Sequence, residues 1–167
     1  LFTPRVTLVS EAIATIPGHI GISIAASPDQ NQLYIITRLK TNTPKGSLFR
    51  IQNGTVTELL SNRDFPRTVA FNSFDSKVYW CDFTGGVGKF LRIDPSTLSF
   101  SEFATVSDCD DGFVRTSPTG WELLFSTHSD GQIKRLDSTA AQSVIASLTP
   151  RVLDATADSA GNLYVAL

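Results

Sequence analysis

Methionine is absent from the 167-residue sequence, and histidine and cysteine occur only twice each. Because the chain begins at Leu1, we expect that processing has removed the natural N-terminus or that the sequence is an excerpt of a longer polypeptide. The histidines and cysteines show none of the spacings of metal-binding motifs, and no Gly-x-Ser-x-Gly segment occurs. The sequence therefore predicts no zinc site and no catalytic triad.

Charge is sparse, and long apolar runs are missing. Charged residues make up 18% of the sequence, the net charge is −2, and lysine and arginine form no stripe. No apolar run approaches the ~18 residues that span a membrane. These absences predict that the protein binds no nucleic acid and inserts into no membrane.

A repeat is the main feature that the sequence does have. Four apolar strand cores lie 45, 45 and 40 residues apart, centred on Tyr34, Tyr79, Leu124 and Tyr164. A second marker, an arginine followed by an aliphatic residue, recurs at intervals of 42 and 43 residues, at Arg50, Arg92 and Arg135. A period in the low forties built from short strands is the length of one four-stranded propeller blade.

The repeat predicts an all-β fold, a β-propeller of about four four-stranded blades within a single domain, 1–167. Three blades are expected at approximately 20–60, 67–106 and 112–148, and both termini, 150–167 and 1–16, form the fourth. Such a ring closes by pairing its own ends, which removes exposed strand edges. The alternative is that the chain contains four consecutive repeats of a six-bladed ring.

Two segments carry a resemblance to known propeller families. Val78–Asp82, followed by Arg92-Ile93-Asp94, resembles the YWTD repeat of lipoprotein-receptor propellers. The segment 161–166, Gly-Asn-Leu-Tyr-Val-Ala, resembles NHL repeats and is similar to the SMP-30/gluconolactonase/strictosidine-synthase-like group. The resemblance implies a six-bladed propeller superfamily, of which this chain contains only about four repeats.

The stretch from Asp110 to Trp121 is similar to a lactonase segment, Asn-Asp-Gly followed by a turn and Gly-Arg-x-Trp. In those enzymes, residues at the start of each blade's first strand hold a divalent metal at the axis through oxygen atoms. The corresponding positions here are His19, Arg67, Asp110 or Asp111, and Arg151. Two arginines are electrostatically unsuited to a metal cavity, so we expect no metal and no lactonase activity. Asp110 or Asp111 is instead expected to pair with one of these arginines, which would leave no carboxylate free as a general base.

One face of the predicted disc collects the charged residues where first strands start and second strands end. These binding-face candidates are His19, Arg38, Arg67, Asp82, Asp110, Asp111, His128 and Arg151. They are suited to a small anion, a peptide carboxylate or a partner loop, or they pair with one another and close the top of the ring. The acidic segment 108–112 lacks the alternation of a calcium-binding EF-hand loop.

The two cysteines are predicted to lie on this same face. Cys81 ends the second strand of one blade and Cys109 precedes the first strand of the next, so they are expected either to form a disulfide or to remain two separate buried thiols. Asn53-Gly54-Thr55 is an N-glycosylation sequon in a predicted hairpin turn, where Asn-Gly is also favoured for its backbone angles.

These observations favour a non-enzymatic, extracellular or secreted propeller that acts as an interaction or structural module. A protein partner or neighbouring domains of a larger assembly are expected, and no cofactor. One alternative is a hydrolase or lyase similar to SMP-30 and strictosidine synthase. Another is a binder of a small ligand or glycan in the crevices between blades.

Overall fold

The computed structural model of the protein describes residues 12–41, 45–117, 120–148, 152, 154–158 and 162–166. Fourteen strands and no helix are present in this part of the chain. No helix that could span a membrane occurs among these residues. The predicted all-β fold is confirmed, and its architecture is that of a partial β-propeller.

Three sheets contain four antiparallel strands each, paired in chain order. The first consists of β1 (His19–Ala26), β2 (Gln32–Leu39), β3 (Lys45–Gln52) and β4 (Thr55–Asp64). The second consists of β5 (Pro66–Asn72), β6 (Lys77–Thr84), β7 (Val87–Ile93) and β8 (Phe100–Val106). The third consists of β9 (Gly112–Ser117), β10 (Gly120–Ser126), β11 (Gln132–Asp137) and β12 (Gln142–Ser147). The fourth sheet is a hairpin of β13 (Asp154–Ala157) and β14 (Leu163–Ala166).

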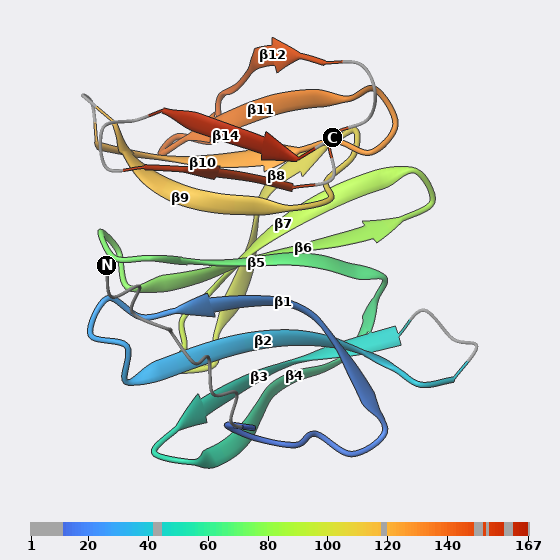
Figure 1. Ribbon diagram of the computed structural model, residues 1–167, viewed down its shortest axis with the longest axis vertical. Coiled ribbons are helices and arrows are strands. Elements are labelled where there is room, and N and C mark those ends of the chain that lie inside the picture. The colour runs from blue at the N-terminus through green and yellow to red at the C-terminus, as the bar shows by residue number, and fades with distance from the viewer. Residues whose placement is uncertain are drawn as a thin grey trace, which may run out of the picture.

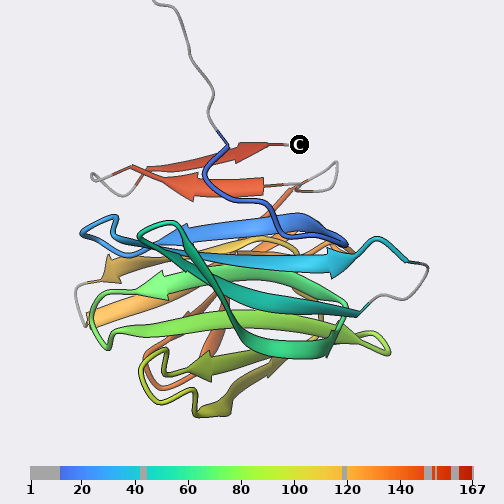
Figure 2. The ribbon, with the colours of Figure 1, turned by 90° about the horizontal axis from the view of Figure 1, so that it is seen from below.

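The three four-stranded sheets follow one another along the long axis of the molecule, and the β13–β14 hairpin lies at the level of β9 and β10 (Figure 1). The first strands of successive sheets contact each other in the order β1, β5, β9 and β13. Figure 2 shows β1 and β9 on the side of the molecule where the β13–β14 hairpin lies, and β8 on the opposite side. The start of each first strand is thereby brought to the inner side of the arc, as in a propeller.

Aromatic residues on adjacent positions of β6 fill the spaces on the two sides of the second sheet. Tyr79 packs with Trp121 and Phe125 of the third sheet, whereas Trp80 packs with Tyr34 and Ile36 of the first. Both β6 residues are fully buried. Because side chains alternate across a strand, one apolar run supplies both interfaces, as the resemblance to YWTD repeats implies.

The Asn53–Gly54 turn connects β3 to β4, as the sequence predicts. Asn53 has a φ of 51° and Gly54 a φ of 75°. Positive φ at both central residues is the requirement of a type I′ turn, which Asn-Gly meets with little strain. Asn53 is exposed, and its glycosylation stays a prediction.

The predicted composite blade lies partly outside the described residues. Residues 1–11 are not described, and residues 12–16 form no strand, although a strand was expected over 11–16. In the described part, β14 pairs with β13 alone. On β1, Ile20 and Ile24 remain more than half exposed, so this end of the arc presents an apolar face.

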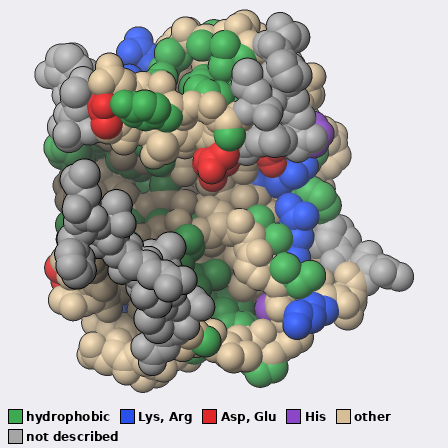
Figure 3. Space-filling model, viewed as in Figure 1, with side chains coloured by type: hydrophobic (Ala, Val, Ile, Leu, Met, Phe, Trp, Pro, Cys, Tyr) green, Lys and Arg blue, Asp and Glu red, His purple; other side chains and the backbone are tan. Residues whose placement is uncertain are grey.

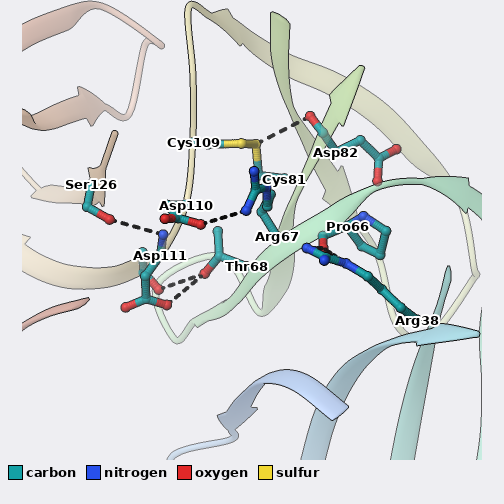
Figure 4. The surroundings of a disulfide bond; sticks show 11 residues. Arg38, Pro66, Arg67, Thr68, Cys81, Asp82, Cys109, Asp110, Asp111 and Ser126 are labelled. Carbon is teal, nitrogen blue, oxygen red and sulfur yellow. Dashed lines mark hydrogen bonds and ion pairs between the residues drawn. A yellow bond between two sulfur atoms is a disulfide. The ribbon is translucent and has the colours of Figure 1, made fainter. Parts of the chain in front are cut away.

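A disulfide joins Cys81 of β6 to Cys109, in the connection that precedes β9. Both residues are fully buried, and their Cα atoms lie 6.6 Å apart. The prediction of this bridge from the positions of the two residues is confirmed. The bond fastens the second sheet to the third beside the polar cluster shown in Figure 4.

We predict that reduction of this disulfide destabilises the protein by about 2–4 kcal/mol, because the unfolded chain regains the conformations that a 28-residue loop closure removes. Urea unfolding with and without dithiothreitol measures the difference. Since the sequence holds no other cysteine, the double variant Cys81→Ser/Cys109→Ser should match the reduced protein and be insensitive to the reductant. Coincident unfolding midpoints for oxidised and reduced wild type would contradict the prediction.

Candidate functional site

A polar cavity of about 310 Å³ lies where the four sheets converge, and we call it the axial pocket. Its lining comes from the first, second and fourth sheets and from the connection before β9, and consists of Ile22, Arg38, Arg67, Asp110, Asp111 and Asp154. Acidic and basic side chains lie side by side on the face of the molecule seen in Figure 3. Four of the eight predicted binding-face residues therefore meet in one pocket.

The propeller topology accounts for this convergence. Arg67 is the second residue of β5, Asp110 and Asp111 directly precede β9, and Asp154 is the first residue of β13. First strands start at the same end of the arc, so side chains at equivalent positions of successive sheets face one cavity. Arg38 joins them because β2 runs antiparallel to β1 and ends at that edge.

Asp110 is the counter-ion of Arg67. The Arg67 Nη1 atom donates to Asp110 Oδ1 over 3.0 Å, and the two side chains are only 17% and 15% exposed. His128 Nδ1 lies 3.4 Å from Asp110 Oδ2. A further predicted binding-face residue therefore lies beside this ion pair. The predicted pairing of an arginine at this position with Asp110 or Asp111 is thus confirmed.

Asp111 is held in a different way. Its backbone N–H donates to Ser126 Oγ over 3.1 Å, and the Thr68 hydroxyl donates to its Oδ1 over 3.3 Å. Burial raises the pKa of Asp111 to about 7, with a further increase from the hydrogen bond to Asp154 and the negative charge of that group. Asp111 is therefore a carboxyl group that gains and loses its proton near neutral pH.

The sequence predicted that either Asp110 or Asp111 would pair with an arginine. In the structure Asp110 forms this pair and Asp111 does not. We expected the arginine pairing to leave no carboxylate free as a general base, and this expectation is wrong. Asp110 takes the ion pair with Arg67, while Asp111 faces Asp154. Asp154 was not identified from the sequence. Like Arg67 and Asp111, it lies at the start of the first strand of its sheet.

Arg38 and Arg67 flank the ring of Phe65, the single residue between β4 and β5. Their guanidinium carbons lie 4.0 and 4.5 Å from the ring centroid. Arg38 also donates from Nε and Nη2 to the carbonyl oxygen of Pro66, over 3.2 and 3.1 Å (Figure 4). The pKa of Arg38 is lowered, first by burial and then by the charge of Arg67.

Glycine at position 46 allows this arrangement. Gly46 pairs with Arg38 across β2 and β3. A Cβ atom here would lie 1.9 Å from the Thr37 carbonyl oxygen and 2.5 Å from Pro66 Cγ. Only glycine therefore lets the first sheet approach Pro66 closely enough for the Arg38 hydrogen bonds.

The remaining binding-face candidates have other surroundings. His19 Nδ1 lies 2.7 Å from the Thr37 hydroxyl oxygen, and its ring meets Phe49 edge-on. Asp82 accepts two hydrogen bonds from Arg63, over 2.9 and 2.6 Å. Figure 4 shows Asp82 and Asp110 on opposite sides of the disulfide. Arg151 lies outside the described residues.

The donor set of the axial pocket does not fit a divalent cation. Hard cations require several oxygen ligands at short range, whereas Asp111 and Asp154 share this pocket with two guanidinium groups. Asp108 turns elsewhere, with its Oδ2 accepting from the Ser129 backbone N–H over 2.7 Å. Nowhere in the described ranges do three His, Cys, Asp or Glu side chains form a group that could hold a metal.

No protein-family model matches the sequence, and no curated protein matches it. Solved structures do match. A gluconolactonase from Xanthomonas campestris is 16% identical with a TM-score of 0.69, over 87% of this chain and 53% of that one. A luciferin-regenerating enzyme is 19% identical with a TM-score of 0.66, over 90% and 54%. The calcium-binding protein regucalcin from Agrobacterium tumefaciens is 19% identical with a TM-score of 0.60, over 78% and 45%.

These matches correct the functional prediction. The chain spans about half the length of the structures named above, and these identities establish the fold alone. The resemblance to SMP-30-like propellers is supported at that level. The expectation of a non-enzymatic module is contradicted, because the neighbours are mostly enzymes or enzyme-like proteins.

We predict that Asp111→Asn stabilises the protein at alkaline pH. The folded-state pKa of Asp111 is raised to about 7, so its proton favours the folded state, and this contribution is lost as the pH rises from about 4 through 7. The variant should escape this loss and unfold several degrees higher at pH 8, a gain of about 1–2 kcal/mol. At pH 4 the two proteins should differ little.

Thermal unfolding between pH 4 and 8 measures this difference. Asp94→Asn is the matched control, because hydrogen bonds from Lys77 and Ser96 lower the pKa of Asp94. That variant should lose stability at pH 8 rather than gain it. Equal unfolding temperatures for wild type and Asp111→Asn across this range would refute the pKa that burial gives Asp111.

Proposed function

We propose that the protein is a hydrolase of the SMP-30-like class that opens an ester or lactone in the axial pocket. The observation that carries the proposal is the arrangement of that pocket, in which Asp111 and Asp154 share one cavity with the guanidinium groups of Arg38 and Arg67. A general base needs a carboxylate whose pKa lies near the working pH. A carbonyl that becomes an oxyanion needs a nearby fixed positive charge.

The proposed reaction begins with water bound beside the ionised Asp111. The carboxylate takes one proton from water while the water oxygen attacks the carbonyl carbon, and a tetrahedral oxyanion forms. Collapse of this oxyanion breaks the bond to the alkoxy oxygen, which receives the proton from the Asp111–Asp154 pair. Lactone and water thereby give a hydroxy acid, and the carboxyl pair returns to its starting protonation.

Arg67 is the proposed electrophilic group. Its ion pair with Asp110 fixes one edge of the guanidinium, through Nη1, and the rings of Phe65 and Phe83 lie 4.5 and 5.5 Å from its guanidinium carbon. A cation fixed before the reaction stabilises the developing charge without a cost of reorganisation. In the proposed reaction, Arg67 and the Asp111–Asp154 pair supply the electrophile and the base.

We also propose that the protein works outside the cell, next to neighbouring domains of a larger polypeptide or assembly. The Cys81–Cys109 disulfide supports an oxidising compartment. The exposed isoleucine face of β1 supports a covering neighbour.

The proposal predicts hydrolysis of small esters or lactones whose kcat/KM rises with pH through about 7, as Asp111 loses its proton. Asp111→Asn should lower kcat by about 100-fold or more. Asp154→Asn removes the negative charge that helps to raise the Asp111 pKa, so the acid limb of the profile should move below pH 7. Asp110, Arg67, Arg38 and His128, the other charged groups at this site, remain in that variant.

A panel of p-nitrophenyl esters and aliphatic δ-lactones, assayed from pH 5 to 9, provides the measurement. Glu102→Gln is the control, because Glu102 is exposed on the outer strand β8 and its loss should leave the profile unchanged. Undiminished activity in Asp111→Asn, or an acid limb that stays in place in Asp154→Asn, would exclude the assigned base.

A further inference from the structure

We propose that Arg38, placed on Phe65, forms an anion subsite that receives a carboxylate of the substrate at the end of the axial pocket opposite the Asp111–Asp154 pair. This inference rests on the proposed function, because it names the class of substrate that the proposed hydrolase would take. It assigns an acidic ester or lactone, rather than a neutral one, as the class of molecule that the pocket takes.

The charges of the pocket point to Arg38. Arg67 has its counter-ion in Asp110. Arg38 donates two hydrogen bonds to the neutral carbonyl oxygen of Pro66, and it forms no ion pair with any carboxylate in the part of the chain that the structure describes. Partial burial and the charge of Arg67 lower the Arg38 pKa, and the charge of Asp110 offsets this only in part. An incoming carboxylate would relieve both effects.

Phe65 provides a second, independent observation. It has a φ of 41°, which is an outlier for a bulky aromatic residue and costs about 1–3 kcal/mol. Its carbonyl oxygen is fixed by the Phe83 backbone N–H over 3.2 Å. The strained backbone places its ring within 4.0 Å of the Arg38 and 4.5 Å of the Arg67 guanidinium carbon. Such strain is retained where it positions functional groups.

The donors that remain also suit a carboxylate. Nη1 of Arg38 is not used in its bonds to Pro66. A guanidinium presents paired N–H groups that match the two oxygens of a carboxylate. Arg38 on β2 therefore offers donors to a carboxylate, while Arg67 on β5, the proposed electrophilic group, contacts the same Phe65 ring.

The rest of the pocket lining is acidic and apolar. Asp111 and Asp154, at the starts of β9 and β13, supply acidic groups, and Ile22 of β1 adds an apolar surface. A volume of about 310 Å³ is at the lower end of the range for small-molecule sites. A short acyl chain with a carboxylate at one end and the reacting carbonyl at the other fits this polarity.

Binding of succinate to the full chain tests the subsite without requiring turnover. Isothermal titration calorimetry should show binding that Arg38→Gln weakens by about tenfold or more. Arg38→Lys should recover only part of it, because lysine keeps the charge but not the paired donors. Phe65→Leu should weaken binding to a smaller extent. The matched control is Arg92→Gln, since Arg92 is exposed on β7.

Kinetics then separate the subsite from the reaction. Two substrates are compared: the mono-p-nitrophenyl ester of succinate, which keeps a free carboxylate, and the same ester with an uncharged amide in place of that carboxylate. Arg38→Gln should raise KM about tenfold for the first substrate and leave KM for the second unchanged. Absence of succinate binding in the wild type, or equal binding in Arg38→Gln, overturns the subsite. Equal KM values for acid and amide in the wild type also overturn it, while the hydrolase proposal stands. Arg38-dependent succinate binding without hydrolysis of either ester supports the subsite and refutes the hydrolase.

Discussion

The segment from Asp108 to Asp111 is held at three places, and the axial pocket depends on that attachment. The disulfide fixes Cys109 to β6. Backbone hydrogen bonds join Asp110 N–H to the Ser126 carbonyl and Ser126 N–H to the Asp111 carbonyl, over 2.9 and 2.8 Å. Arg67 then draws the Asp110 side chain to the second sheet. Because Asp110 pairs with Arg67, the next residue, Asp111, is the one that faces Asp154.

The two carboxylates of Asp110 and Asp111 show how the environment separates chemically identical groups. A guanidinium compensates the charge of Asp110, whereas Asp111 is itself largely buried, lies beside the carboxyl group of Asp154 and has a pKa of about 7. Such separation of neighbouring groups is a feature of catalytic sites, although structural networks also produce it. In this protein the separation arises because consecutive residues of one connection point to different sheets.

The sequence predicted the fold to the level of individual strands, because a blade is a local unit with its own turns and alternation. The blade predicted at 67–106, for example, is the second sheet, whose four strands lie at 66–72, 77–84, 87–93 and 100–106. The disulfide and the Arg67–Asp110 pair followed from the same periodic placement. The role of Asp154 could not be predicted in this way. Its place in the pocket depends on how the β13–β14 hairpin lies against β9, and nothing in the neighbouring sequence indicates it. Phe65 was missed as well, because a residue before proline is expected to be extended, whereas here it has a positive φ.

The functional prediction failed at an identifiable step. It treated the arginines as substitutes for lost metal ligands and took catalysis at the axis to require a metal, so the presence of arginine argued against an enzyme. The pocket instead combines guanidinium groups with a carboxyl pair. Residue types at single positions could not show this combination, because Asp110 and Asp111 were interchangeable in the sequence and became distinct only through contacts with Arg67 and Asp154.

The disulfide also changes how the molecule would respond to mechanical force. A chain pulled from residues in the first and third sheets transmits tension through Cys81 and Cys109, so the 28-residue stretch between them cannot extend. Since an extended residue contributes about 3.3–3.6 Å, the fully stretched oxidised chain is shorter than the reduced chain by roughly 90 Å. Within the second sheet, β7 and β8 lie in this closed loop, and β6 ends in it. The disulfide would therefore keep the strands that form the centre of the arc close together even after their hydrogen bonds had broken.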